Sequence, residues 1–105
     1  MNVMQQRTIS RKEIENQSIY RTRYWTVLFP QRPVSPYHFL MILNRDDANH
    51  FIDVADQELI DLKSLIGFLT KSITGDVLLT GYNLFSNNGT YEIGQHLTRF
   101  HQHIF

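Results

Sequence analysis

The sequence predicts an α+β fold, in which an antiparallel sheet of about five strands carries one main amphipathic helix and a short N-terminal helix or arm. Segments rich in β-branched and aromatic residues lie on both sides of one long segment with helical periodicity, and turn-forming residues separate them. A chain of 105 residues with 42% hydrophobic content is long enough for one core and too short for two ordinary domains. We therefore expect one domain over residues 18–105, preceded by a polar arm over residues 1–17.

The polar arm contains one helix signal. Ser10 is followed three residues later by Glu13, a spacing in which both side chains can satisfy backbone N–H groups of a first helical turn. The arm has little apolar material to bury and lacks the apolar core of a signal peptide. The longest apolar run, residues 39–43, is far too short to span a bilayer. We expect a soluble, cytoplasmic protein.

Two strands are predicted next, on either side of a proline loop. Residues 18–29 are rich in Tyr, Thr, Trp, Val and Phe, which favour a strand. The loop that follows is held extended by three prolines, Pro30, Pro33 and Pro36. Residues 37–43 form the second strand, with His38 just inside its start. A short connection between two strands predicts a hairpin.

The main helix is predicted over residues 56–73. Apolar residues recur there at steps of three and four, along the stripe formed by Leu59, Leu62, Ile66, Leu69 and Ile73. Acidic residues near the start and Lys71 near the end suit the helix dipole, and Gly75 is a stop signal. We expect the stripe to face the core.

The chain then returns to strand composition. Residues 77–86 favour a strand, and Asn87-Asn88-Gly89 is a turn signal before a final strand over residues 95–105. Residues two apart share one face of a strand. One face of the final strand is expected to carry Leu97, Arg99, His101 and His103. The other face carries Thr98, Phe100, Gln102 and Ile104, so that Phe100 and Ile104 can enter the core.

Charge and cysteine content exclude several classes of function. Ten basic residues balance ten acidic ones, which argues against broad attraction to nucleic acid or to an anionic membrane. The absence of cysteine removes disulfides, thiolate metal sites and thiol catalysis. Two imidazoles on one strand face remain as the main candidates for chemistry, because imidazole can act as nucleophile, base or ligand near neutral pH.

Three separated motifs occur in the order and spacing of a known family. They are SPYHFLMIL at residues 35–43, GYNLFSNNG at residues 81–89, and Gly94-Gln95 followed by Arg99, His101 and His103. With these motifs the chain resembles the histidine triad family of nucleotide hydrolases and transferases, over roughly residues 18 to 105.

The resemblance implies a specific chemistry. A nucleoside monophosphate is cleaved from a phosphoramidate or dinucleotide through a covalent histidine intermediate, with His101 as nucleophile. His103 contacts the transferring phosphate or assists the leaving group, and Arg99 holds the first triad position. The contacts implied for the phosphate or nucleotide come from His38, Asn88, Gly94, Gln95, His96 and Leu97. The substrate implied is a purine nucleotide or nucleotide conjugate, without a cofactor, and the assembly implied is a homodimer.

Two of the departures from the family pattern bear most on the chemistry of the site. Arg99 replaces a histidine that partners the upstream histidine, here His38. Arginine cannot act as a base, although its guanidinium can bind phosphate oxygens in a bidentate manner. The acidic residue that family members use for the ribose falls on Pro30. These departures leave a second interpretation open, a catalytically weak nucleotide-binding regulatory domain.

A metal site is the third interpretation. His101 and His103 could share a zinc ion with His38 or His96, because imidazoles two apart on a strand can bind one metal. We give it less weight, since no acidic residue is close to the pair in sequence. We therefore expect no metal.

Overall fold

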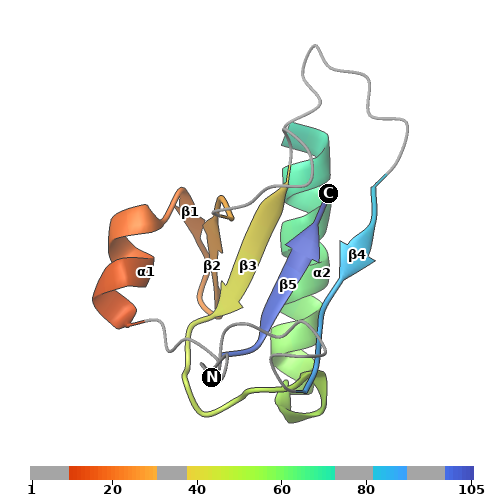
Figure 1. The fold of residues 1–105 in the computed structure, drawn as a ribbon. Helices are drawn as coiled ribbons and strands as arrows, with labels where there is room; N and C mark the ends of the chain where they lie inside the picture. The colour runs from red at the N-terminus through yellow and green to blue at the C-terminus, as the bar shows by residue number, and fades with distance from the viewer. Residues whose placement is uncertain (1–9, 31–37, 73–81, 90–98) are drawn as a thin grey trace, which may run out of the picture.

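The computed structural model describes residues 10–30, 38–72, 82–89 and 99–105 (Figure 1). Sequence predictions for Ile73, Gly75, residues 77–81 and residues 94–98 lie outside the described residues. The elements, in chain order, are α1 (Arg11–Gln17), β1 (Tyr20–Arg21), β2 (Trp25–Leu28), β3 (Phe39–Leu43), the 3-10 helix η1 (Phe51–Asp53), α2 (Asp56–Ser72), β4 (Leu84–Phe85) and β5 (His101–Ile104).

Within the described residues, five strands form one antiparallel sheet in the order β1-β2-β3-β5-β4. The last strand of the chain, β5, lies between β3 and β4, so the sheet brings the C-terminal histidines next to the strand that follows His38. Helix α2 covers one face of this sheet, and α1 lies beside β1 and β2 (Figure 1). The predicted α+β class, with one main helix on an antiparallel sheet, is confirmed.

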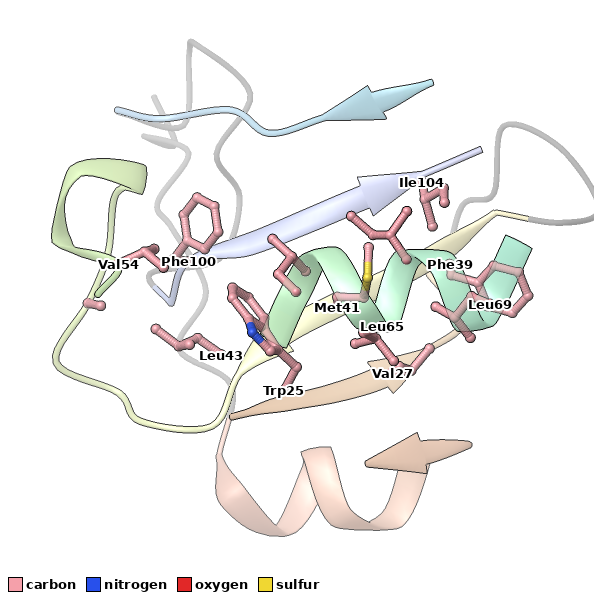
Figure 2. Close-up of a cluster of buried hydrophobic side chains, with 13 residues drawn as sticks. Trp25, Val27, Phe39, Met41, Leu43, Val54, Leu65, Leu69, Phe100 and Ile104 are labelled. Atoms are coloured by element: carbon pink, nitrogen blue, oxygen red, sulfur yellow. The ribbon is translucent and has the colours of Figure 1, made fainter. Parts of the chain in front are cut away.

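The face of the sheet under α2 carries the main core (Figure 2). Alternate residues of β2 and β3 point into it, and Phe100 and Ile104 join them from the end of the chain, as predicted. The helix contributes Leu62, Leu65, Ile66 and Leu69, while Leu59 packs at the margin. The predicted stripe on α2 is therefore confirmed for its described members, and Leu65 widens it.

The other face of the sheet carries a second, smaller cluster. Leu28, Leu40 and Ile42 pack there against Ile14 of α1. Helix α1 begins where the sequence predicts, because the Ser10 side chain accepts a hydrogen bond from the Glu13 N–H at 3.1 Å. The short N-terminal helix thus covers part of the sheet face that points away from α2, and the histidines lie on this same face.

One predicted strand is in fact two. Residues 18–29 form the short hairpin β1–β2, because the chain turns at Thr22. The Thr22 hydroxyl accepts from the Trp25 N–H at 3.1 Å and donates to the Asp61 carboxylate at 2.7 Å, and Asn44 donates to the Thr22 carbonyl at 3.1 Å. The prediction of one strand was wrong because Asp61 and Asn44 hold this turn from distant parts of the chain.

The remaining elements agree with the predictions where they are described. The hairpin across the proline loop is confirmed, with Trp25 opposite Leu43 in the β2–β3 register. Among residues 82–86, the described part of the predicted 77–86, β4 covers Leu84–Phe85, and Gly89 in the predicted turn has φ 146°, a conformation that favours glycine. Strand β5 begins at His101, so Arg99 lies in a bend before it. No described helix has the length and apolarity required to cross a membrane.

Candidate active site

Strand pairing brings three histidines to one face of the sheet. In the β3–β5 register, His101 lies opposite Ile42 and His103 lies opposite Leu40. Ile42 and Leu40 belong to the face away from α2, and His38 precedes Leu40 by two residues on the same face. His38 and His101 are buried and His103 is half-buried. The site therefore combines two segments that lie 65 residues apart in sequence.

The orientation of His101 is fixed by the backbone just before its strand. Its Nδ1 lies 2.9 Å from the backbone carbonyl oxygen of Arg99, which is buried. A carbonyl oxygen can only accept, so Nδ1 must carry the hydrogen. In the neutral ring Nε2 then carries the lone pair, which is the form that a nucleophilic imidazole requires.

His38 and His103 form a hydrogen-bonded pair. Nε2 of His38 lies 2.8 Å from Nδ1 of His103, so one ring donates and the other accepts. Burial lowers the pKa of His38, because the charged form loses solvation. Two cationic rings at this separation would both present a hydrogen and repel one another. The pair therefore holds at most one proton between the two atoms.

Two phenylalanine rings border the pair, and neither was among the predicted site residues. The Phe105 ring lies 5.1 Å from the His38 ring, and the Phe85 ring of β4 lies 6.1 Å from the His103 ring. Phe105 follows His103 by two residues, so strand alternation could have indicated it. Phe85 could not be found in this way, because its place depends on the pairing of β4 with β5.

Arg99 is placed differently from the triad histidine that it replaces. It is buried, and its Nη2 lies 4.0 Å from the Asp46 carboxylate in the loop after β3. His38, the partner expected for this position, is paired with His103 instead. No local pattern in the sequence relates Asp46 to Arg99, which lies far along the chain, so Asp46 could not be predicted as its partner.

Of the predicted phosphate-binding set, the structure describes His38 and Asn88. The Asn88 Oδ1 accepts from the Phe51 N–H of η1 at 2.6 Å, and its Nδ2 donates to the Ser86 hydroxyl at 3.1 Å. These contacts place the Asn88 amide beside η1. Gly94, Gln95, His96 and Leu97 lie outside the described residues. In the part of the chain that the structure covers, no group of three or more His, Asp or Glu is arranged as metal ligands.

Comparison with known proteins identifies relatives at the level of fold and family. The family model described as the HIT domain matches residues 11–105. The search of curated proteins gave no match.

Several solved structures are similar. A Plasmodium falciparum diadenosine triphosphate hydrolase, in complex with cyclomarin A, has 23% identity and a TM-score of 0.74, over 92% of this chain and 62% of its own. A HIT family protein from Bacillus anthracis has 21% identity and a TM-score of 0.75, over 90% and 68%. A histidine triad protein from Clostridium difficile has 26% identity and a TM-score of 0.60, over 85% and 76%. The chain thus spans less than two thirds of the Plasmodium protein.

Proposed function

Because this chain belongs to the HIT domain family, we propose that it is a nucleotide hydrolase or transferase that cleaves a nucleoside monophosphate from a phosphoramidate or dinucleotide. Two observations support this proposal. A structurally similar protein is a diadenosine triphosphate hydrolase, and His101 has the tautomer and the buried setting of an imidazole nucleophile. The contact between His101 Nδ1 and the Arg99 carbonyl is the observation that carries the proposal.

The reaction proceeds in two steps. Nε2 of His101 attacks phosphorus, a P–N bond forms, and the bond from phosphorus to the leaving group breaks with its electron pair. His103 contacts the phosphate or gives a proton to the leaving group. In the second step water, or another acceptor with an O–H group, attacks the phosphorus and gives its proton to His103, and the P–N bond returns its electrons to His101. The nucleoside monophosphate is released or transferred.

The hydrogen bond between His38 and His103 supports this division of roles. Because Nδ1 of His103 is engaged with His38, Nε2 is the ring atom through which His103 serves the leaving group. The Gly94 to Leu97 backbone, Gln95 and the Asn88 amide complete the proposal as hydrogen-bond donors to the phosphate oxygens. The role of Arg99 that the geometry supports best is played by its carbonyl oxygen, which orients His101.

We expect the protein to act as a homodimer in the cytoplasm, without a cofactor. Among the described strands β4 lies at one edge of the sheet, and Tyr82, Leu84 and Phe85 on or beside it are about half exposed. A second copy of the chain that pairs along this edge would cover both the backbone of β4 and these side chains.

A catalytically weak nucleotide-binding regulatory domain is the second candidate. The observation that favours it is Arg99, which stands at the first triad position and pairs with Asp46. Under this alternative the protein binds a nucleotide, and turnover is absent or very slow.

The decisive experiment measures release of nucleoside monophosphate from adenosine phosphoramidate and from a small set of dinucleotides. We expect turnover by the wild type and a loss of at least about 100-fold in His101→Ala and in His101→Asn. Asparagine keeps a donor toward the Arg99 carbonyl and cannot attack phosphorus, so it tests chemistry apart from packing. His50→Ala is the matched control, because His50 lies beside η1, outside this site. Nucleotide binding without turnover in the wild type would favour the regulatory domain, and turnover that survives both His101 variants would exclude the proposed nucleophile.

A further inference from the structure

The peptide group that orients His101 is held from two sides. Its oxygen, the Arg99 carbonyl, accepts from His101, and its nitrogen, Phe100 N–H, donates to the Ala48 carbonyl at 2.9 Å. The two groups of one trans peptide point in opposite directions in one plane. An anchor on the Phe100 N–H therefore also fixes the direction of the Arg99 carbonyl. Residues 44–48, the loop after β3, thus determine how His101 is presented.

The Arg99 side chain gives the same residue a second anchor on this loop. Its side chain is 8% exposed, whereas its Asp46 partner is 85% exposed. A guanidinium removed from water depends on a nearby anion more than an exposed carboxylate depends on its cation. Loss of the Asp46 charge would therefore drive the Arg99 side chain to rearrange, and the backbone of Arg99 would move with it.

The loop itself has a firm support. Arg45 donates to both carboxylate oxygens of Glu58, at 2.8 Å each, and to the Asp53 carbonyl at 2.7 Å. Glu58 is buried on α2, so Arg45 ties the loop to the main helix. Asp46 is therefore presented to Arg99 from a supported loop.

We propose that Asp46 is a positioning residue for His101: it holds the Arg99 side chain, and the Arg99 carbonyl in turn holds His101 in the Nδ1–H tautomer. The consequence for turnover rests on the proposed function, whereas the consequence for the tautomer does not. This chain carries arginine at the first triad position, and under this proposal the pairing of Arg99 with Asp46 helps to orient His101.

The test uses the full chain with ¹⁵N-labelled histidine. The imidazole ¹⁵N chemical shifts of His101 report the ratio of the two neutral tautomers. Asp46→Asn should shift this ratio away from Nδ1–H by about two- to five-fold, the size expected for one ion pair that is partly exposed. In the turnover assay kcat should fall by a similar factor, with a smaller change in KM.

Asp47→Asn is the matched control. Asp47 is the next residue of the same loop and pairs with Arg45 instead of Arg99. It removes the same charge from the adjacent residue, so any general electrostatic effect on an anionic substrate appears in both variants. Asp46→Glu should retain the wild-type ratio, because it keeps the charge within reach of Arg99.

Each outcome decides the inference. The inference is overturned if Asp46→Asn has the same His101 tautomer ratio as the wild type and Asp47→Asn. It is also overturned if Asp46→Asn, Asp47→Asn and Asp46→Glu all shift the ratio equally. If the wild type shows no turnover, the proposed function fails, and the tautomer ratio still decides the role of Asp46.

Discussion

The histidine pair gives single residues a direct influence on stability. His38 is buried, and its Nε2 is engaged with His103. Burial lowers its pKa from the ordinary value of 6.5, so His38 binds a proton less readily in the folded protein than in the unfolded chain. His38 is thus held neutral at a place where a cation would face another imidazole.

We predict that stability falls as the pH is lowered through 6.5. Between the ordinary and the lowered pKa of His38 the unfolded chain binds more protons than the folded chain, so the free energy of unfolding decreases as the pH falls. One such group changes it by at most about 1.4 kcal/mol per pH unit. Urea denaturation of the wild type and of His38→Gln between pH 7 and about pH 5 measures the slope.

The variant isolates the titration from the hydrogen bond. Glutamine can place its Nε2 donor near the position of the His38 Nε2 and does not titrate. His50→Gln, which removes a histidine outside the pair, is the control and should retain the wild-type slope. An unchanged slope in His38→Gln would mean that His38 does not set this pH dependence.

Among the elements, the start of α2 shows how a loop and a helix depend on one buried carboxylate. The Glu58 Oε1 accepts from the Ala55 N–H at 2.8 Å, which satisfies a donor at the helix start. Arg45 binds the same carboxylate with two nitrogens and lowers its pKa through these hydrogen bonds. The Glu58 carbonyl also accepts from the Trp25 indole at 2.9 Å, which joins α2 to β2.

We predict that Arg45→Met lowers the free energy of unfolding by about 2 kcal/mol, because it leaves the Glu58 carboxylate buried without its cation. Arg21→Met is the control. Arg21 lies 3.9 Å from Glu15, and both side chains are close to half exposed, so its loss should cost less than about 0.5 kcal/mol. Chemical denaturation measures both values. If both variants lose the same free energy of unfolding, the buried pair contributes no more to stability than the exposed pair.

For the whole molecule, β1 and β4 lie at the two edges of the sheet formed by the described strands. At the β1 edge, where α1 lies close by, Tyr20 is partly exposed, and at the β4 edge Leu84 and Phe85 are half exposed. Unpaired backbone groups beside exposed apolar side chains are a template for pairing with another strand. The proposed homodimer would use the β4 edge.

We predict that light scattering at micromolar concentration gives the mass of two chains. Leu84→Lys should shift the distribution toward one chain, since it places a charge on the pairing edge. Ile52→Lys is the control, because Ile52 on η1 is 86% exposed and does not belong to β4, and the dimer should persist. A wild type that has the mass of one chain would contradict the prediction.

Local patterns in the sequence determined most of the fold. The stripe on α2, the Ser10 cap of α1 and the hydrophobic strands each depend on residues a few positions apart, which local geometry places on one face or at one end. Alternation also placed Phe100 and Ile104 in the core and His101 and His103 on the opposite face. The motif spacing pointed to the family that residues 11–105 match.

Only the tertiary structure decided how the site is connected. The pairing of His38 with His103, of Arg99 with Asp46 and of Asn88 with Phe51 joins residues from different elements, and so does the Thr22–Asp61 bond that divides the first predicted strand in two. Such partners depend on strand register and helix docking, which bring together residues with no fixed spacing along the chain. The sequence therefore determined which side chains share a face, and tertiary packing decided which atoms on that face bind one another.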